Sequence, residues 1–204
     1  MSTLQDRGVV CDSFVADISL SQNCFAAVDA AIAKFGRLDV LVNCAGITHI
    51  APAADLSEDV WNRMLAVNLS APFWFYQAAL PHLLASQGCI INVASNSAVK
   101  ANAYIAAYAA TKAGLTQLTK ALALEHVDAP IRINAVAPGG MATEMASESI
   151  HMAGADVAKL APMMNTRGIN ETADVAAVVA FLASPPAKVF HGAILIADQG
   201  VAAG

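Results

Sequence analysis

Charged residues are scarce in this sequence of 204 residues, because Asp, Glu, Lys and Arg together make up 13% and apolar residues make up 57%. Ordinary soluble domains carry roughly 25% charged and roughly 45–50% apolar residues. Long apolar runs are nevertheless missing, since the longest stretch without a charged residue, 64–99, is interrupted by Asn, Gln, His and Pro. A helix that crosses a bilayer needs about 20 nearly continuous apolar residues, so we expect no membrane span.

Three further features are missing, and each excludes a class of protein. Lys and Arg number 11 against 16 Asp and Glu, and they form no basic stripe of the kind that binds nucleic acid. The four cysteines form no Cys-x-x-Cys pair and the five histidines are dispersed, which argues against metal sites and disulfide frameworks. The first eight residues lack the apolar core of a secretion signal. We therefore expect a cytoplasmic protein that binds no metal, nucleic acid or membrane.

Short apolar runs alternate with amphipathic stretches of helical length along the whole chain. The runs predict strands at residues 9–17, 38–43, 89–95, 131–137 and 193–197. The stretches predict helices at residues 21–35, from Ser57 to about 81–86 with a bend near Pro72, at 106–126 and at 171–183. This alternation indicates one α/β domain over residues 1–204, with a doubly wound parallel sheet. Such a sheet is covered on both faces, which accounts for the apolar composition.

Tyr108 and Lys112 lie four residues apart in one predicted helix, and therefore on one helix face. A tyrosine has a pKa of about 10, which makes it a poor base at neutral pH. An ammonium beside it would favour the phenolate and lower that pKa, so that Tyr108 could exchange a proton with an alcohol or a carbonyl. On its own this spacing occurs often by chance, and it is more typical of an ordinary surface pair on a helix.

The surrounding segments give the pair its context. In chain order they are Asp17, Leu-Val-Asn43-Cys-Ala45-Gly46, Val-Asn68-Leu, Ile-Asn-Val-Ala-Ser95, Tyr108-Ala-Ala-Thr-Lys112, and Asn-Ala-Val-Ala-Pro138-Gly139 with Thr143. In order and spacing they resemble the classical short-chain dehydrogenase/reductase family, and the resemblance covers essentially the whole chain. It implies a Rossmann-like fold and a nicotinamide-dependent oxidoreductase.

The resemblance also implies catalytic roles for four residues. Tyr108 would be the acid/base for the substrate oxygen, and Ser95 would hold the same oxygen. Lys112 would lower the pKa of Tyr108 and bind the nicotinamide ribose. Asn68 would organise a water that relays protons to Lys112, although its side chain could instead only satisfy a neighbouring backbone.

For the cofactor, NAD or NADP without distinction, the resemblance implies contacts at Lys112 and at eight further residues: Asp17, Ile18, Asn43, Ala45, Gly46, Pro138, Gly139 and Thr143. Asp17 and the Ile18 backbone would meet the adenine, the next three would line the adenosine side, and the last three would hold the nicotinamide. Simpler roles remain open for some of them. Asp17 and Thr143 could cap helices, and the two glycines could serve turns alone.

The glycine-rich turn with which the family begins, Gly-x-x-x-Gly-x-Gly, is not found in this sequence. That turn holds the pyrophosphate of the cofactor. The resemblance therefore implies an N-terminally truncated fold, with the first two strands and helices missing, and weakened binding of the dinucleotide. It also implies an unpaired apolar edge at residues 38–43. Residues 9–17 could move over to pair with that edge, another chain could cover it, or the true protein could start further upstream.

The function expected from these observations is the interconversion of a secondary alcohol and a ketone by an NAD(P)-dependent oxidoreductase with a small-molecule substrate. One alternative is a catalytically silent subunit for binding or assembly, because the glycine-rich turn is missing. Another is dehydration or epimerisation on the same scaffold. Small residues line the helix from Ala106 to Gly114, and family members pair through this helix. We therefore expect a homodimer or a homotetramer.

Overall fold

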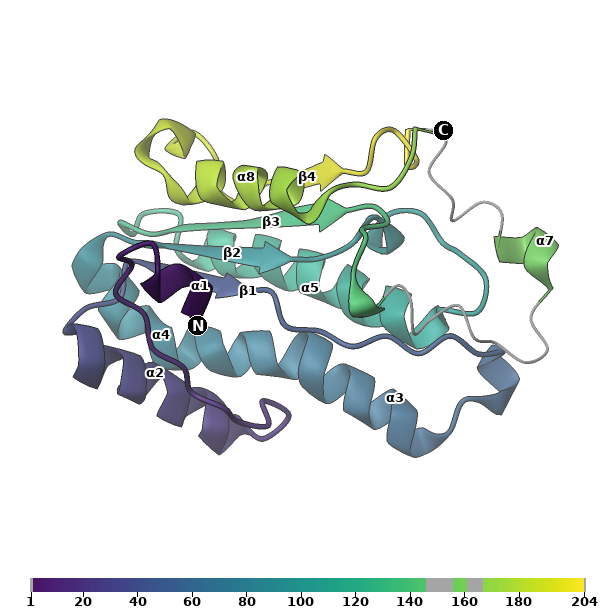
Figure 1. The fold of residues 1–204 in the computed structure, drawn as a ribbon, viewed down its shortest axis with the longest axis horizontal. Helices are drawn as coiled ribbons and strands as arrows, with labels where there is room; N and C mark the ends of the chain where they lie inside the picture. The colour runs from purple at the N-terminus through teal and green to yellow at the C-terminus, as the bar shows by residue number, and fades with distance from the viewer. Residues whose placement is uncertain (1, 146–155, 161–166, 204) are drawn as a thin grey trace.

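A parallel sheet forms the centre of the molecule in a computed structural model that describes residues 2–145, 156–160 and 167–203. Within these ranges the strands are β1 (Val40–Asn43), β2 (Cys89–Val93), β3 (Arg132–Pro138) and β4 (Ile194–Ala197), in the order β1-β2-β3-β4. Asn43 pairs with Asn92, and Pro138 pairs with Ala197. All carboxyl ends therefore meet at one edge of the sheet, on the right in Figure 1.

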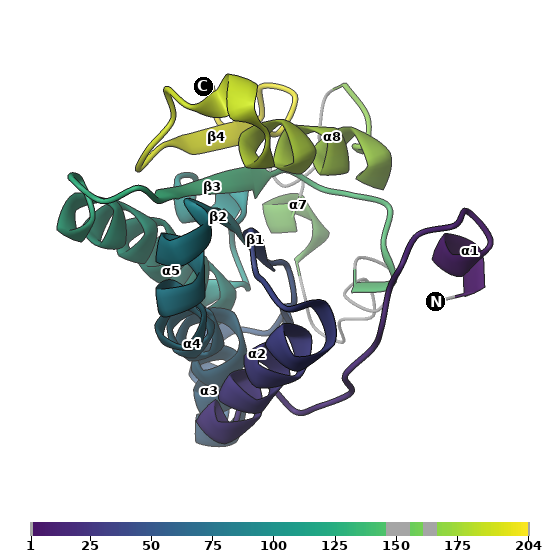
Figure 2. The ribbon, with the colours of Figure 1, turned by 90° about the vertical axis from the view of Figure 1, so that its left-hand side faces the viewer.

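Helices cover both faces of this sheet (Figures 1 and 2). One face carries α4 (Ala71–Ser86) and α5 (Ala106–Glu125), and α2 (Ser21–Phe35) packs on α4. The other face carries α8 (Thr172–Ala183). α3 (Glu58–Leu65) precedes α4, and the short helices are α1 (Ser2–Gln5) and α7 (Val157–Leu160). The doubly wound α/β arrangement predicted from the sequence is confirmed.

The core consists of an apolar layer on each side of the sheet. Ile90 lies with Leu83 and Ile133 on the α4 and α5 side, whereas Ile91 lies with Leu182 on the α8 side. Successive strand residues point to opposite faces, so β2 contributes to both layers and is buried along its whole length. These two apolar layers account for the high apolar content of the sequence. Across the described ranges, no helix has both the length and the apolarity to cross a membrane.

Local signals in the sequence set the helix boundaries that the structure shows. Gly36 adopts the left-handed conformation, with φ 76°, and ends α2 where the sequence predicted. The Ser57 side chain accepts a hydrogen bond from the Val60 N–H at 3.3 Å and caps α3. The bend expected near Pro72 takes the form of a π-helical turn, Ala66–Ser70, which joins α3 directly to α4.

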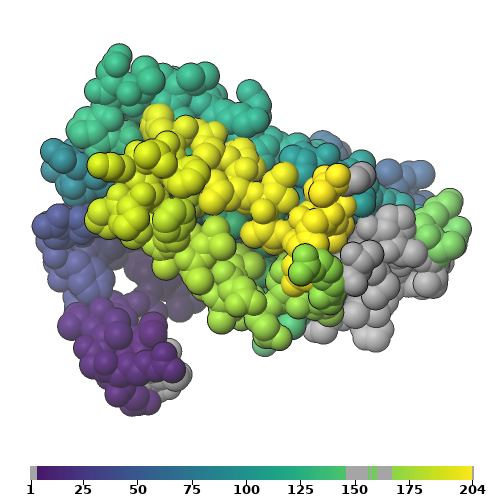
Figure 3. Space-filling view, turned by 90° about the horizontal axis from the view of Figure 1, so that it is seen from above, coloured from purple at the N-terminus to yellow at the C-terminus, as the bar shows by residue number. Residues whose placement is uncertain are grey.

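The strand predicted at residues 9–17 is wrong. The segment is not part of any strand, and Val10 and Val15 are 80% and 97% exposed. Its apolar residues suit a strand, but a strand exists only where a neighbouring edge accepts its hydrogen bonds, and this segment does not lie on β1. The N-terminal residues project from the body of the molecule in Figure 3. Of the three ways to cover β1, pairing with residues 9–17 is therefore excluded, and Val42 on β1 is 40% exposed.

Some of the small residues of α5 pack against other parts of the same chain. Ala107 is buried, and a Cβ on Gly114 would lie 3.0 Å from Leu69 Cδ2 in the π-helical turn. Gly114 thus permits the close approach of α5 to that turn. The predicted pairing of two copies through this helix stays a prediction.

Candidate active site

Ser95 and Tyr108 meet beyond the carboxyl end of β2. Ser95 is extended, with φ −167°, and its Oγ accepts a 3.1 Å hydrogen bond from the Ser97 N–H at the start of the 3₁₀ turn Asn96–Ala98. α5 begins at Ala106, so Tyr108 lies in its first turn. The Ser95 side chain is close enough to Tyr108 to lower the pKa of its phenol. The structure therefore brings together the two residues that were expected to hold the substrate oxygen.

Lys112 lies one helical turn after Tyr108 and is 4% exposed. Its Nζ donates a 2.8 Å hydrogen bond to the carbonyl oxygen of Val93 and lies 5.8 Å from the centre of the Tyr108 ring. Burial lowers the pKa of Lys112 to about 8, and the nearby Cys44 thiol partly counteracts this. The side chain is thus a buried, positively charged group at neutral pH.

The pKa of Tyr108 is shifted in the direction opposite to the one predicted from the spacing. Burial raises this pKa, and the nearby Ser95 side chain lowers it by a smaller amount. Burial dominates because removing a phenolate from water disfavours the charged form. Tyr108 is therefore protonated at neutral pH, and the loss of its proton needs the help of neighbouring groups.

Asn68 is buried in the π-helical turn, a type of distortion that is frequent at functional sites. Its Oδ1 accepts a hydrogen bond from the Ile47 N–H, and its Nδ2 donates one to the Ile47 carbonyl oxygen, both at 2.9 Å. Nδ2 also lies 3.2 Å from Thr111 Oγ1, which donates to the Tyr108 carbonyl oxygen. The side chain therefore satisfies a neighbouring backbone, and Thr111, which sequence reasoning missed, connects it to α5.

Gly46 brings the loop after β1 against the same group of residues. A Cβ on Gly46 would lie 3.2 Å from Asn68 Oδ1 and 3.5 Å from Lys112 Nζ. Because only a glycine leaves this space free, backbone and ligand can approach Lys112 closely at this position.

A hollow lies beside this loop at the carboxyl end of β1. It is lined by Ile18, by residues 41–45 and by Val67, Ala71, Pro72 and Phe75. The structure thus places three of the residues expected at the adenosine side, Ile18, Asn43 and Ala45, around one mainly apolar hollow. Flat aromatic ligands commonly bind in pockets of this character.

The Asn43 side chain is held by a buried polar chain that crosses the sheet. Asn43 Nδ2 donates to Asn92 Oδ1, and Asn92 Nδ2 donates to Thr119 Oγ1 on α5, both at 2.8 Å. Asn92 and Thr119 were not identified from the sequence. The available signal was a polar residue in the middle of a strand that is otherwise apolar.

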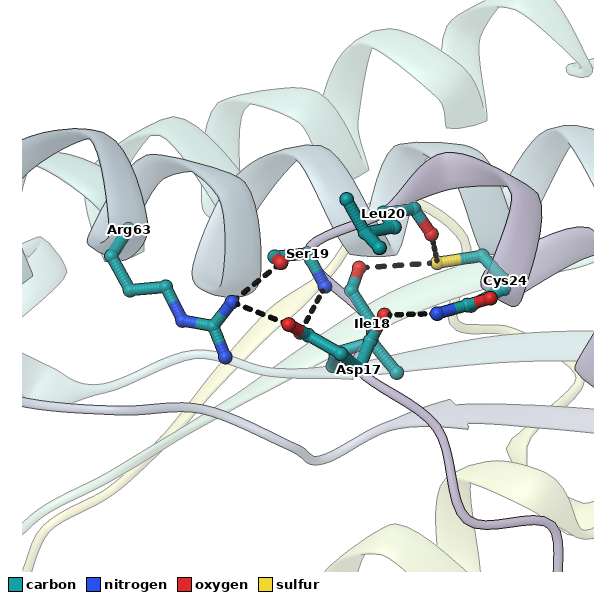
Figure 4. Close-up of polar contacts among 7 residues, drawn as sticks. Asp17, Ile18, Ser19, Leu20, Cys24 and Arg63 are labelled. Atoms are coloured by element: carbon teal, nitrogen blue, oxygen red, sulfur yellow. Dashed lines mark hydrogen bonds and ion pairs between the residues drawn. The ribbon is translucent and has the colours of Figure 1, made fainter. Parts of the chain in front are cut away.

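Asp17 directly precedes Ile18, which lines the hollow, and its carboxylate is bound by other groups of the protein (Figure 4). Its Oδ2 lies 2.9 Å from Nη1 of Arg63 on α3, and its Oδ1 accepts a 3.0 Å hydrogen bond from the Ser19 N–H. The hydrogen bond from Arg63 is the main reason why the pKa of Asp17 is lowered to about 2. Asp17 does not cap α2, whose N-cap is Leu20. The role of Arg63 was missed by sequence reasoning.

Gly139, at the end of β3, is packed against the loop that follows β4. A Cβ on Gly139 would lie 2.9 Å from Asp198 Cβ, and the buried Asp198 carboxylate accepts a 3.3 Å hydrogen bond from Asn96 Nδ2. This contact accounts for the glycine without a cofactor. Pro138 is buried and Thr143 is exposed four residues beyond Gly139, and their roles at the nicotinamide stay predictions.

Two observations fit a dinucleotide along this edge of the sheet. The space beside Gly46 gives access to Lys112, and the hollow beside Ile18 can take a flat ring. In the described part of the chain, no group of three or more His, Cys, Asp or Glu residues could hold a metal ion.

The comparisons with known proteins agree with this geometry. Residues 2–202 match the family described as Enoyl-(Acyl carrier protein) reductase. The chain is 38% identical to D-threitol dehydrogenase of Mycolicibacterium smegmatis over 95% of its length and 72% of that protein. It is 37% identical to 3beta-hydroxysteroid dehydrogenase 1 of Eggerthella lenta, covering 97% of the chain and 76% of that protein. A dehydrogenase/reductase from Sinorhizobium meliloti superposes with a TM-score of 0.87 at 33% identity, over 98% of this chain and 78% of that one. The chain therefore belongs to the short-chain dehydrogenase/reductase family of oxidoreductase enzymes.

Proposed function

We propose that the protein interconverts a secondary alcohol and a ketone with NAD or NADP, and that Tyr108 is the acid/base. The observation that carries the proposal is the group formed by Ser95, Tyr108 and Lys112 at the carboxyl edge of the sheet. Relatives named for D-threitol, a 3beta-hydroxysteroid and cyclopentanol support an alcohol as the substrate class.

In the direction of reduction, the Tyr108 hydroxyl donates its proton to the carbonyl oxygen of the substrate. The phenol is protonated at neutral pH and can donate its proton, although burial raises the pKa of Tyr108 and makes it a weaker acid. The Ser95 hydroxyl binds the same oxygen and fixes its position relative to Tyr108. In the direction of oxidation, Tyr108 has to be in its phenolate form to accept the proton from the alcohol.

Lys112 would bind the cofactor and stabilise the negative charge that develops on Tyr108. An ammonium has three N–H donors, and one of them is used by the Val93 carbonyl oxygen. The other two can bind the hydroxyls of the nicotinamide ribose. Its positive charge also favours the Tyr108 phenolate that forms when the proton leaves.

The remaining cofactor contacts follow the edge of the sheet. Ile18, Ala45 and Gly46 would meet the adenosine half, and Pro138, Gly139 and Thr143 would meet the nicotinamide half. When bound, the nicotinamide supplies the hydride chemistry. Asn68 holds the Gly46 loop through the Ile47 backbone, and the water that it would organise for Lys112 is part of the proposal.

Steady-state turnover of cyclopentanol and cyclopentanone with NAD(H) and NADP(H) tests the proposal. We expect Tyr108→Phe to lower kcat by on the order of 10²- to 10⁴-fold without loss of the folded state, because only the acid/base hydroxyl is removed. Tyr76→Phe is a matched control. Tyr76 Oη is bonded at 2.7 Å to His126, at the end of α5 remote from Tyr108, and this variant should keep its activity.

A folded wild-type protein that turns over no alcohol or ketone with either cofactor would contradict the proposal. A Tyr108→Phe variant as active as the wild type would contradict the role of Tyr108. The first result would favour the silent subunit for binding or assembly.

A further inference from the structure

We propose that Arg63 is a positioning residue for the cofactor. It fixes the turn at residues 17–19 so that the Ile18 backbone N–H, and not the Asp17 carboxylate, is presented to the adenine ring. The inference rests on the proposed function for the identity of the ligand.

Both carboxylate oxygens of Asp17 are engaged inside the protein (Figure 4). Arg63 Nη1 binds Oδ2 at 2.9 Å and also contacts Ser19 Oγ, whereas the Ser19 N–H binds Oδ1 at 3.0 Å. Each oxygen therefore already accepts a hydrogen bond, and a ligand could use only the remaining lone pairs of a carboxylate whose charge is neutralised by a guanidinium.

The backbone carbonyls of the same turn are engaged too. The Asp17 carbonyl oxygen accepts a 2.9 Å hydrogen bond from Asn23 Nδ2, and the Ile18 carbonyl oxygen accepts a 3.3 Å contact from Cys24 Sγ. Among the described residues, by contrast, the Ile18 N–H has no acceptor. Because Ile18 also lines the hollow beside β1, its N–H is the donor that remains for a ring nitrogen of a bound base.

Arg63 ties this turn to α3, whereas Asn23 and Cys24 tie it to α2. The preceding residues belong to no strand, so the sheet does not hold the turn from that side. Arg63 belongs to α3, which continues without a break into the π-helical turn that contains Asn68. Loss of Arg63 would release the turn from the helix that carries Asn68.

The ion pair between Arg63 and Asp17 is exposed, so an effect of Arg63 on the position of the turn can be measured without an effect on folding. The side chains of Arg63 and Asp17 are 49% and 46% exposed. Exposed ion pairs contribute little to stability, because water and salt screen them. An Arg63 variant should therefore fold normally, and a defect in binding can be attributed to the geometry of the turn.

Calorimetric titration with three probes tests the inference. NADH and ADP-ribose carry an adenosine, whereas reduced nicotinamide mononucleotide does not. We expect Arg63→Met to lower the affinity for NADH and for ADP-ribose by about tenfold. The affinity for the mononucleotide should not change. Arg63→Lys should bind with intermediate affinity, since it keeps the charge. Arg37→Met is the control, because Arg37 forms an ion pair with Asp39, 2.6 Å long, that lies before β1 and is more exposed than the pair of Arg63 and Asp17.

A second measurement needs no cofactor. Carbon-detected NMR titration should show the pKa of Asp17 near 2 in the wild type and at a clearly higher value in Arg63→Met, because the largest cause of the lowering is removed and the hydrogen bonds with Ser19 remain. An Asp17 pKa that does not move in this variant would overturn the inference.

Three binding results would also overturn it. The first is that Arg63→Met and Arg37→Met bind NADH with equal affinity. The second is that Arg63→Met loses as much affinity for the mononucleotide as for NADH. The third is that the wild type binds neither NADH nor ADP-ribose. Tighter binding by Arg63→Met would show instead that a released Asp17 contacts the adenine directly. A wild type that binds NADH and has no turnover contradicts the proposed function and leaves the role of Arg63 intact.

Discussion

The Nζ of Lys112 on α5 donates a 2.8 Å hydrogen bond to the carbonyl oxygen of Val93, the last residue of β2. Two residues further along the chain lies Ser95. The buried charge of the site is therefore attached to the same strand end that positions the proposed oxygen-binding hydroxyl. Three predictions follow from contacts of this kind.

The burial of Lys112 should be visible in the stability of the protein. Its pKa falls from 10.5 to about 8 on folding, which corresponds to about 3 kcal/mol. Since the folded state releases this proton more easily than the unfolded state, the buried charge is unfavourable below pH 8. The penalty disappears as the pH rises from about 8 to 10.5. Lys112→Met should therefore be more stable than the wild type at pH 7, by up to about 3 kcal/mol, and inactive.

Urea unfolding between pH 7 and 10.5 measures this difference. The advantage of Lys112→Met over the wild type should shrink with rising pH, because only the wild type carries the titrating group. Lys120→Met, at an exposed position of the same helix, should show no such trend. A difference between Lys112→Met and the wild type that stays constant over this range would contradict the prediction.

The space beside Gly46 should matter for activity more than for folding. In Gly46→Ala the new methyl would lie 3.2 Å from Asn68 Oδ1, which has to shift by a few tenths of an ångström, and it would lie in ordinary contact, 3.5 Å, with Lys112 Nζ. We expect kcat/KM to fall about tenfold, while overpacking lowers the free energy of unfolding by about 1 kcal/mol. Enzyme assays and thermal unfolding measure the two effects.

Gly140→Ala provides the comparison for this prediction. A Cβ on Gly140 would have no atom within 4 Å, so its activity and stability should match those of the wild type. Equal activity of Gly46→Ala and Gly140→Ala would show that the space beside Lys112 is not needed for turnover.

The parts of the structure that the sequence predicted correctly depend on local signals. Gly36 ends α2 and Ser57 caps α3, and both effects act within a few residues of the chain. The failed strand at 9–17 depended on a partner, which a local apolar pattern cannot supply. The sequence therefore predicted the layers of the fold and misplaced its first segment.

The site shows the same division. Tyr108, Lys112 and Ser95 were predicted from the resemblance to a family, which depends on motifs in a fixed order and spacing along the chain. Arg63 and Asp17 are 46 residues apart, and only the fold brings them into contact. The pKa of Tyr108 depends on burial, which spacing does not determine, so the direction of its shift was predicted wrongly.

The buried polar chain from Asn43 to Thr119 should be needed for stability. Asn92 lies in its middle, is 2% exposed, and uses Oδ1 for Asn43 and Nδ2 for Thr119, both at 2.8 Å. Asn92→Leu leaves the Asn43 amide without its buried acceptor, and we expect the free energy of unfolding to fall by about 2–3 kcal/mol.

A double-mutant cycle with Thr119→Val isolates the contact with α5. Thr119 Oγ1 also donates a 2.8 Å hydrogen bond to the Leu115 carbonyl oxygen, so Thr119→Val alone should be destabilising. The double variant should nevertheless lose less free energy of unfolding than the sum of the losses in the two single variants, because each substitution removes the same Asn92–Thr119 hydrogen bond. Urea unfolding of the four proteins gives the coupling energy. Strict additivity would mean that the Asn92–Thr119 contact contributes nothing, and Asn92 would then act on Asn43 alone.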